Sequence, residues 1–378
     1  MLQPGQTLGI IGGGQLGRML AEEARTAGFH TVVFTDEYPP SPAGQVATRE
    51  INAPYYDPEA TADFVSAVDV VTMEFENIPS EFIETVEQRL PVFPAREALY
   101  LCQNREREKN FLLKQGLPHA QFLVVDGAES LAAATAKIGG PCMLKTAAFG
   151  YDGKGQFRLS GDENMSEIWA SFGAPRGVVE QLVDFQCELS VVGARGQDGT
   201  YVPFPVCENI HKNQVLDHTI SPARVSPEIA VRATEVAKAV AEALDYVGTL
   251  GVELFLNQDG DILVNEIAPR PHNSGHHTID SCSTNQFSQQ LRAVADIALG
   301  NPRQHTPAVM VNLLGDIWPE DGGNPDWSAV LAHPTAKLHL YGKRTAKPGR
   351  KMGHFTVLAD TPDEALAEAV KLRKSLGM

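Results

Sequence analysis

The N-terminal part of the chain alternates short apolar runs with segments of helical periodicity. Three apolar runs, each bounded by polar or glycine-containing segments, predict strands: residues 7–11, 31–34 and 68–73. Residues 15–26 predict a helix that ends at Gly28, and another is expected from about Ser80, whose hydroxyl can cap its first turn. Strands that alternate with helices are typical of a parallel sheet, so we expect a Rossmann-like α/β domain over residues 1–104.

The pattern changes after a long helical segment at 96–115, which glycine and proline at 116–118 bring to an end. We place a domain junction in this helix. Beyond it, longer alternating runs predict an antiparallel sheet, with strands at 177–183, 186–195, 201–210, 249–257 and 261–267. Asp-Gly pairs at 198–199 and 259–260 are typical of hairpin turns. We therefore expect a central α+β domain over residues 105–302.

The C-terminal part is a smaller unit. A helix at about 285–299 and the sequence Gly-Asn-Pro at 300–302 precede it. Three further strands are expected near 308–314, 336–341 and 353–358. Thr361, followed by Pro362 and Glu364, predicts the start of a last helix. The fold class is thus α/β and α+β multidomain, with a β-rich C-terminal domain at 303–378.

The composition excludes several classes of protein. The 378 residues carry 31 Lys and Arg against 47 Asp and Glu, a formal charge of −16, which argues against a nucleic-acid partner. No run approaches the ~18 apolar residues of a membrane helix, so no membrane partner is expected. The N-terminus lacks the features of a signal peptide, and five scattered cysteines indicate reduced thiols. We expect a cytoplasmic location.

A glycine-rich motif follows the first predicted strand. Residues 12–17 fit G-x-G-x-x-G, and Asp36 stands at the end of the second strand, as in dinucleotide-binding proteins. A glycine turn at a helix N-terminus also binds other phosphorylated or anionic ligands, and it can serve turn geometry alone. This motif leaves an NAD-dependent dehydrogenase, another anion-binding protein and a structural turn as alternatives.

A second glycine-rich segment follows a predicted strand at 141–145. Lys145 ends that strand, and residues 150–156 contain three glycines whose amides can close over phosphate oxygens. The spacing of a Walker A loop is absent. The segment is therefore either a phosphate-binding flap or a hairpin turn with solvated lysines.

Two glutamates are expected to face each other across a hairpin. If Asp259-Gly260 forms a two-residue turn, residues 258 and 261 pair, and the same register places Glu253 opposite Glu266. Like charges in directly opposite positions destabilise a sheet, and a divalent cation between them removes the repulsion. Mg²⁺ prefers one or two carboxylates together with nucleotide phosphates. A solvated acidic pair is the alternative, and a shifted register would separate the two side chains.

Polar groups are concentrated in residues 265–277, which contain a carboxylate, an arginine, several histidines and two prolines. Adjacent histidines without cysteine do not suit a tetrahedral zinc site. Recognition of an anion or a sugar fits these residue types better.

Taken with these motifs, the chain resembles the ATP-grasp superfamily and, within it, the N5-carboxyaminoimidazole ribonucleotide synthetases of purine biosynthesis. The resemblance covers nearly the whole chain and is carried by four segments, residues 12–17, 72–79, 150–156 and 265–276 together with 350–354. It implies a pre-ATP-grasp domain, an ATP-grasp domain and a C-terminal domain that completes the substrate site. Many ATP-grasp enzymes have a ligating Asn two positions after the second metal-binding glutamate, where this chain has Ala268.

The resemblance assigns ATP and magnesium to particular residues. ATP would be held by Arg105, Lys145, Gly150, Tyr151, Asp152, Gly153, Lys154, Gly155, Gln156, Glu180, Gln181, Leu182, Val183, Glu188, His211, Asn265 and Glu266. Two Mg²⁺ ions would be held by Glu253 and Glu266. Catalytic roles fall to Arg270, Lys145, Tyr151 and Asp152.

The implied reaction is ATP-dependent carboxylation of 5-aminoimidazole ribonucleotide by bicarbonate, through carboxyphosphate or CO₂ released from it. The ribonucleotide would meet Gly14, Gln15, Leu16, Glu74, Asn77, Arg270, His272, Asn273, Ser274, Lys343 and Arg350. Residues 337–354 contain six basic and no acidic residues. We therefore expect this basic strip to bind phosphorylated ligands, although the net charge of the chain is negative. A homodimer is also implied.

Other functions remain to be distinguished. A dehydrogenase would have no use for Lys145 or the glutamate pair, and a catalytically silent nucleotide sensor would bind ATP without releasing phosphate. A formate-dependent transformylase of the same superfamily shares an E-x-x-P-R-P-H run, but residues 273–276 and 350–354 favour the aminoimidazole enzyme. A biotin-linked carboxylase is disfavoured because no A-M-K-M sequence is present.

Overall fold

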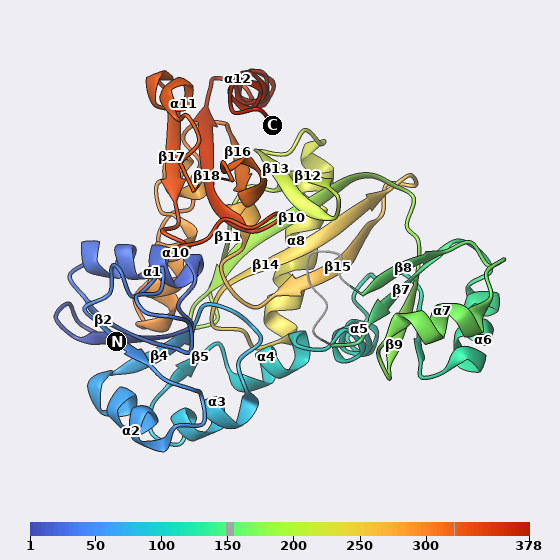
Figure 1. Ribbon diagram of the computed structural model, residues 1–378, viewed down its shortest axis with the longest axis horizontal. Helices are drawn as coiled ribbons and strands as arrows, with labels where there is room; N and C mark the ends of the chain where they lie inside the picture. The colour runs from blue at the N-terminus through green and yellow to red at the C-terminus, as the bar shows by residue number, and fades with distance from the viewer. Residues whose placement is uncertain (149–154, 321) are drawn as a thin grey trace.

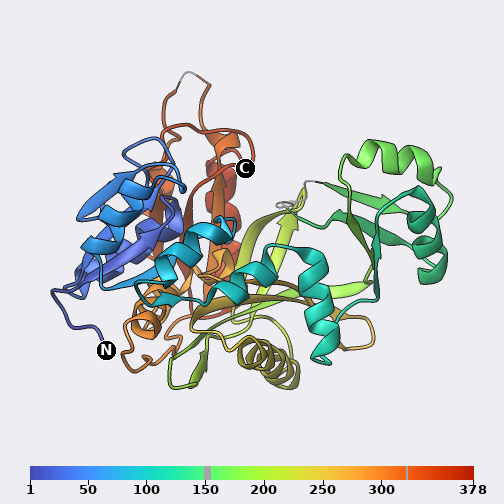
Figure 2. The ribbon, with the colours of Figure 1, turned by 90° about the horizontal axis from the view of Figure 1, so that it is seen from below.

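The described part of the chain folds around three β-sheets (Figure 1). The computed structural model describes residues 1–148, 155–320 and 322–378. A parallel sheet lies at the N-terminal end, a long antiparallel sheet crosses the molecule, and a small antiparallel sheet stands at the opposite end (Figure 2). Among the described residues, no helix is both long and apolar enough to cross a membrane.

The N-terminal sheet is parallel, as the alternating pattern predicts. Its order is β3-β2-β1-β4-β5, with β1 (Thr7–Ile11), β2 (His30–Thr35), β3 (Arg49–Asn52), β4 (Val70–Met73) and β5 (Val92–Phe93). The chain builds outward from β1 in both directions, so the strand order reverses between β1 and β4. The crevice at the carboxyl ends of these two strands is where open α/β sheets place their ligands.

The connecting helices of this sheet are α1 (Gln15–Thr26), α2 (Pro58–Ala67) and α3 (Ser80–Glu87). The predicted end of α1 is confirmed, because Gly28 follows the helix with a φ of 83°. The predicted cap of α3 is wrong. Ser80 is already the first helical residue, Pro79 precedes it as N-cap, and no side chain caps that turn.

The predicted helix at 96–115 is also wrong in one respect, because it is two helices, α4 (Arg96–Cys102) and α5 (Arg105–Lys114). Asn104 adopts an extended conformation between them, and its side chain accepts a hydrogen bond from the amide of Arg107. Asparagine competes for backbone donors in this way and favours helix starts over helix interiors. The break brings the amide of Arg105 to the carbonyl of Ala147 at 2.7 Å, beside the small sheet.

The small sheet has the order β6-β9-β7-β8, with β6 (Phe122–Val125), β7 (Cys142–Thr146), β8 (Gln156–Leu159) and β9 (Gly177–Gln181). Helices α6 (Ala128–Ile138) and α7 (Met165–Phe172) pack on it and share its hydrophobic core. The strand predicted at 177–183 is therefore shorter than expected, and it belongs to a different sheet from the strands that follow it.

The large sheet is antiparallel, as predicted, and runs in the order β15-β14-β10-β12-β13-β16-β18-β17 with β11 paired to β10. Its strands are β10 (Phe185–Arg195), β11 (Tyr201–Pro203), β12 (Cys207–Lys212), β13 (Val215–Ser221), β14 (Gly248–Asn257), β15 (Ile262–Ala268), β16 (Ala308–Leu314), β17 (Ala336–Leu340) and β18 (Lys351–Leu358). Because β13 pairs with β16, the sheet continues across residue 303.

Two features of this sheet differ from the prediction. The strand expected at 201–210 is interrupted, because Pro205 lies between β11 and β12 and has no amide to donate. Strand β13 was not expected. Its turn is formed by Asn213 and Gln214 at positive φ, without the glycine that marks most such turns.

Helices cover both ends of the large sheet. Helix α8 (Pro227–Ala243) packs on β10, β14 and β15, and α12 (Pro362–Ser375) with α11 (Ser328–Ala332) covers the C-terminal strands. Thr361 accepts a hydrogen bond from the amide of Glu364, which confirms the predicted start of α12. Helix α10 (Gln286–Val294) is shorter than the expected 285–299 and packs against α1, so it ties the large sheet to the N-terminal domain.

Three short helices complete the fold: η1 (Asn273–Gly275), α9 (Thr278–Ser281) and η2 (Gly315–Ile317).

Candidate active site

Glu253 and Glu266 face each other across β14 and β15, as the sequence predicts. The predicted register is nevertheless wrong near the turn, where Leu256 pairs with Ile262 and Leu254 with Val264. A β-bulge between these pairs and the glutamates contains Asn265 as the extra residue. The bulge shifts the register by one residue, and this shift places the two carboxylates opposite each other.

The surroundings of the two carboxylates are not alike. Glu253 Oε1 lies 3.1 Å from Nε2 of His272, whereas Glu266 Oε2 accepts a hydrogen bond from Arg105 at 3.2 Å. Burial by itself would raise the pKa of Glu253, but His272 and the positive field of His211 hold that pKa at about 2. Glu253 is therefore a carboxylate at neutral pH.

These residues fit a divalent cation. Both glutamate side chains are partly exposed, and the buried Oδ1 of Asn265 has no hydrogen-bond partner among the described residues. A buried oxygen without a donor is favourable next to a cation and costly otherwise. The part of the chain that the structure describes has no group of three or more His, Cys, Asp or Glu placed to hold a metal, so phosphate oxygens would have to supply further ligands.

Three cationic side chains, of which Lys109 is fully buried and the other two partly exposed, surround Glu180 on β9. Its carboxylate lies 3.2 Å from Lys145, 3.3 Å from Lys109 and 3.7 Å from Arg105. Burial would raise the pKa of Glu180, and the three cations lower it to about 2. Burial also lowers the pKa of Lys145, while Glu180 opposes that shift.

The cluster leaves positive charge in excess. Nη1 of Arg105 is buried and has no hydrogen-bond partner in the described ranges, so it can still donate to an anion. Arg105 and Lys145 were predicted from the sequence, whereas Lys109 was missed. The signal was available, because Lys109 follows Arg105 by one helical turn and lies on the same helix face.

Further residues assigned to ATP lie along the crossing from the small sheet to the large one. Glu188 on β10 pairs with His211 on β12 at 3.0 Å. Burial would lower the pKa of His211, but Glu188 raises it overall. Gln181 ends β9, and residues 182–183 follow it toward β10.

The glycine flap can be described only in part. Gly150, Tyr151, Asp152, Gly153 and Lys154 lie outside the described residues. Gly155 has a φ of 69°, and its carbonyl accepts a hydrogen bond from the amide of Thr146. Gln156 begins β8 and pairs with Lys145. The flap thus leads back into the small sheet directly beside Lys145.

The N-terminal glycine loop is occupied by a carboxylate of the protein itself. Glu74, which follows β4, accepts hydrogen bonds from the amides of Gly14 at 2.5 Å and Gly17 at 2.9 Å. A Cβ atom on Gly14 would lie 2.4 Å from Glu74 Oε1, so a larger residue there would displace the Glu74 carboxylate. Burial raises the pKa of Glu74, although the two amides lower it.

This arrangement bears on the dinucleotide alternative. The amides that would bind a pyrophosphate already bind Glu74, and a second anion at the same helix N-terminus would meet its negative charge. Gln15 and Leu16 continue from this loop into α1. The motif that matched a nicotinamide-binding fingerprint is therefore satisfied internally.

Residues 265–277 contact both the N-terminal domain, through Glu76, and the large sheet, through Ser190. Arg270 donates to Glu76 at 2.5 and 3.2 Å, so the charge that the sequence assigns to substrate is paired with a carboxylate from the segment after β4. Burial would raise the pKa of Glu76, and Arg270 lowers it. Glu76 was missed as a site residue, although it lies in the same Met-Glu-Phe-Glu-Asn segment as Glu74 and Asn77.

Two predicted substrate residues point into the protein. The hydroxyl of Ser274 is 2.8 Å from that of Ser190 and 2.8 Å from Nδ1 of His272, and Ser274 is fully buried. The amide group of Asn273 exchanges hydrogen bonds with that of Asn312. The Ser274 contact orients His272, which in turn contacts Glu253.

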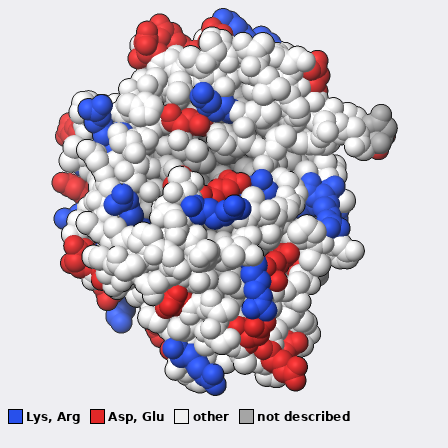
Figure 3. Space-filling model, turned by 90° about the vertical axis from the view of Figure 1, so that its left-hand side faces the viewer, with Lys and Arg blue, Asp and Glu red and all other residues white. Residues whose placement is uncertain are grey.

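The predicted basic strip lies beside the glycine loop. Gln45 donates to the carbonyl of Gly342 at 2.8 Å, which joins the strip to the N-terminal domain. Burial and the charge of Arg350 lower the pKa of Lys343 to about 8, against the opposing effect of Glu74. On the face that carries the N-terminal domain, basic and acidic side chains lie close together around a hollow (Figure 3).

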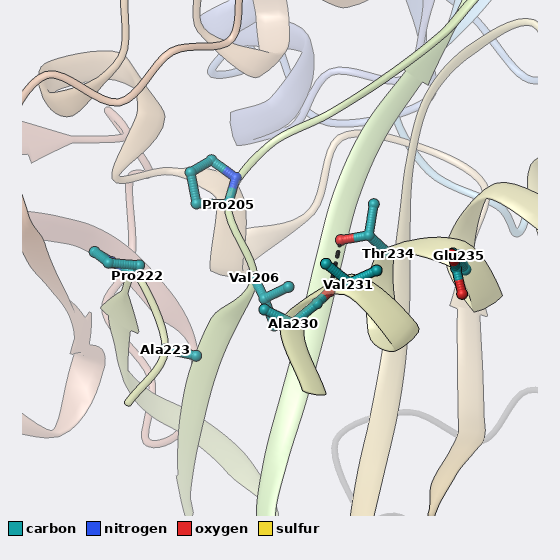
Figure 4. A pocket seen from close by; sticks show the side chains of 8 residues that line it. All are labelled: Pro205, Val206, Pro222, Ala223, Ala230, Val231, Thr234 and Glu235. Carbon is teal, nitrogen blue, oxygen red and sulfur yellow. Dashed lines mark hydrogen bonds between the residues drawn. The ribbon is translucent and has the colours of Figure 1, made fainter. Parts of the chain in front are cut away.

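Two pockets differ sharply in character. A polar cavity of about 40 Å³ is lined by Glu76, Asn77, Cys102, Gln103, Arg105, Glu108, Thr146, Ala147 and Glu266. A larger pocket of about 340 Å³ lies between α8 and the residues that flank β12 and β13 (Figure 4). Its walls are mainly apolar, and the hydroxyl of Thr234 donates a hydrogen bond to the carbonyl of Ala230. The polar cavity is the one next to the charged residues.

Comparison with known proteins agrees with this geometry. The chain matches three family models: a ribonucleotide synthetase preATP-grasp domain at residues 5–103, an ATP-grasp domain at 110–287 and a phosphoribosylaminoimidazole carboxylase C-terminal domain at 308–368. An N5-carboxyaminoimidazole ribonucleotide synthase from Brucella melitensis is 43% identical, with 94% of this chain and 97% of the relative covered.

Solved structures give the same result. The ADP complex of an N5-carboxyaminoimidazole ribonucleotide synthetase superposes with a TM-score of 0.92 at 42% identity, covering 99% of this chain and 97% of that one. The enzyme from Aspergillus clavatus in complex with ADP and 5-aminoimidazole ribonucleotide has a TM-score of 0.90 at 33% identity, covering 99% of each chain. The chain therefore belongs to the N5-carboxyaminoimidazole ribonucleotide synthase family of the ATP-grasp superfamily.

Proposed function

We propose that this protein carboxylates 5-aminoimidazole ribonucleotide with bicarbonate at the expense of ATP, yielding N5-carboxyaminoimidazole ribonucleotide, ADP and phosphate. The observation that carries the proposal is the facing pair Glu253 and Glu266 beside the partly buried cations Arg105 and Lys145. Relatives of the same family have been crystallised with ADP and with the ribonucleotide. The reaction belongs to purine biosynthesis.

ATP binds between the small sheet and the large sheet in this proposal. Arg105 and Lys145 donate to its phosphates, because both are cations held in a partly desolvated position where an anion is strongly favoured. The glycine flap from Gly150 to Gln156 closes over the phosphates. Residues 180–183 meet the base, Glu188 the ribose hydroxyls, and His211 lies next to the nucleotide.

Magnesium fits the carboxylate pair, with Glu253, Glu266 and Asn265 as protein ligands and two ions as the expected number. When bound, Mg²⁺ neutralises phosphate charge and thereby favours phosphoryl transfer. Arg105 holds the Glu266 carboxylate in place, and His272 does the same for Glu253. The protein therefore orients each carboxylate through a neighbouring side chain, the guanidinium of Arg105 for Glu266 and the imidazole of His272 for Glu253.

Bicarbonate accepts the γ-phosphoryl group of ATP and becomes carboxyphosphate. The exocyclic amine of the ribonucleotide then forms a bond to the carboxyl carbon, directly or after CO₂ is released, while phosphate leaves and the amine loses a proton. Carboxyphosphate hydrolyses readily, so exclusion of water by the flap is part of the function. Tyr151 and Asp152 in the flap reach the second substrate in this proposal.

The ribonucleotide binds at the carboxyl ends of β1 and β4. Lys343 and Arg350 bind its phosphate, because the glycine-loop amides already bind Glu74. Gly14, Gln15, Leu16, Glu74 and Asn77 form the N-terminal wall of this site. Arg270 and His272 lie between the ribonucleotide and the carboxylate pair, while Ser274 orients His272 from inside and Asn273 is held by Asn312.

The test is phosphate release from ATP with labelled bicarbonate, with the ribonucleotide supplied and omitted. We expect release to accelerate when the ribonucleotide is present and the labelled carbon to appear in it. ATP binding without phosphate release under both conditions would instead support a nucleotide sensor. Stabilisation by NAD but not by Mg·ATP would support the dehydrogenase.

Three further expectations rest on the family resemblance. The chain acts as a homodimer, is located in the cytoplasm, and divides into units at 1–104, 105–302 and 303–378. Light scattering of the purified protein tests the first, and limited proteolysis near residues 104 and 303 tests the last.

A further inference from the structure

One turn of α5 holds the backbone on both sides of Glu266. Nζ of Lys109 donates to the carbonyl of Asn265 at 2.9 Å, and Oε1 of Glu108 accepts from the amide of Ile267 at 2.6 Å. Two consecutive side chains of one helix therefore contact the two peptide groups that flank the glutamate. Arg105, one turn earlier, contacts the Glu266 carboxylate itself.

Both side chains are deeply buried, with Lys109 1% and Glu108 3% exposed. Burying an ionised side chain costs several kcal/mol unless partners replace the lost hydration. Lys109 recovers part of this cost by pairing with Glu180 at 3.3 Å. Apolar side chains would fill this space at lower cost, so the charged groups are explained by what they hold.

Glu108 and Lys109 hold the bulge that places Glu266 opposite Glu253. On the turn side of the bulge, Leu254 pairs with Val264. If that register continued, Glu253 would lie opposite Asn265, and Glu266 would pair with Val252 and point to the other face of the sheet. The extra residue Asn265 prevents this, and its carbonyl is the group that Lys109 binds.

We propose that Glu108 and Lys109 are positioning residues that hold the Asn265 bulge and thereby keep the Glu266 carboxylate opposite Glu253 for a divalent cation. Neither residue contacts substrate in this proposal. Lys109 also connects the bulge on β15 with Glu180 on β9, so it couples the metal-binding strand to the small sheet. The inference rests on the proposed function, because it assigns a role in Mg²⁺ and nucleotide binding.

Lys109→Met tests it, because methionine has a similar length and no donor. ADP is titrated calorimetrically into the full-length protein with and without Mg²⁺. We expect Mg²⁺ to tighten ADP binding in the wild type, and this tightening to fall by about 10- to 100-fold in the variant, the usual effect of losing a residue that orients a metal ligand. ADP affinity without Mg²⁺ should fall less than affinity with Mg²⁺, because the only loss there is the pairing of Lys109 with Glu180.

Glu108 provides a matched pair of variants if Lys109→Met fails to fold. Glu108→Gln retains an oxygen that can accept from the Ile267 amide, whereas Glu108→Leu has none. We expect the Mg²⁺ effect on ADP binding to be preserved in the first and lost in the second. Lys114→Met, at an exposed position of the same helix, is the control and should behave as the wild type.

The outcomes separate this inference from the proposed function. A wild type that shows the Mg²⁺ effect, with Lys109→Met or Glu108→Leu showing it undiminished, overturns the positioning role alone. Equal losses of ADP affinity with and without Mg²⁺ also overturn it, because they indicate general loosening of the fold. A wild type whose ADP binding does not respond to Mg²⁺ overturns both.

Discussion

Two regions of this protein are predicted from the sequence as ligand sites but differ in how their polar groups are satisfied. At the carboxyl ends of β1 and β4, the glycine-loop amides are engaged by Glu74 of the protein itself. Across β14 and β15, two carboxylates face each other and the Oδ1 of Asn265 has no partner among the described residues. A polar group that the protein leaves incompletely paired indicates a ligand, whereas a fully paired one indicates internal structure.

The largest expected loss of activity follows from a substitution at Glu266. Glu266→Gln keeps the size of the side chain but removes the charge that a divalent cation requires. We expect phosphate release to fall by about 100- to 1,000-fold or more, as when a preorganised electrostatic contact is removed. The unfolding temperature should remain near that of the wild type. Near-normal phosphate release in a folded Glu266→Gln protein would contradict the metal assignment.

Lys343 tests which group meets the ribonucleotide phosphate in place of the glycine loop. Lys343→Ala should raise the KM for the ribonucleotide roughly 10- to 100-fold, the effect of losing a charge-assisted hydrogen bond, and should raise the KM for ATP much less. Equal effects on the two KM values would argue against a phosphate contact.

The pH dependence sharpens the same point. Because the pKa of Lys343 is lowered to about 8, its positive charge is present below that pH and is lost as the pH rises through it. The KM for the ribonucleotide should therefore rise above about pH 8 in the wild type. Lys343→Arg, which stays charged, should show no such rise. If the KM of Lys343→Arg rises above about pH 8 as in the wild type, Lys343 is excluded as the source of the rise.

Glu74→Ala would leave the amides of the N-terminal glycine loop without their acceptor. The amides of Gly14 and Gly17 would lose their acceptor, at a cost of about 1–3 kcal/mol in the free energy of unfolding. Added sulfate should recover part of this loss in the variant, and more than it stabilises the wild type. Urea unfolding with and without sulfate measures both effects. Glu22→Ala on the exposed side of α1 is the control.

The smallest expected change in the free energy of unfolding comes from two helix starts, at Thr361 and Ser80, that look alike in the sequence. Thr361→Ala removes a hydrogen bond to the amide of Glu364 and should lower the free energy of unfolding by about 1 kcal/mol. Ser80→Ala removes no cap and should change that free energy by less than about 0.5 kcal/mol. Equal losses would mean that the Ser80 hydroxyl caps α3 after all.

Local signals were sufficient for many elements. Strand β1, helix α1 and strand β16 lie where their patterns predict them, because periodicity, glycine at a helix end and alternation act within a few residues. Predictions failed where a single residue interrupts a regular pattern. Asn104 divides one predicted helix into two, and Pro205 divides one predicted strand.

The site shows the same division. Glu253 and Glu266 were placed opposite each other by an assumed two-residue turn, yet their alignment depends on the bulge at Asn265. Arg270 was expected to act on substrate, and its pairing with Glu76 joins residues 194 positions apart. Local sequence patterns do not identify Glu76 as the partner of Arg270, because the two residues come together only when the chain folds.

The sequence by itself determined the class of the N-terminal and large sheets, the order of the motifs and, through their resemblance, the family. Only the tertiary structure decided which charges are used internally. Glu74 reaches the glycine loop from 60 residues away, and Lys109 reaches the bulge from 156 residues away. Helix and strand patterns arise from neighbours along the chain, whereas the pairing of buried charges depends on which surfaces are removed from water together.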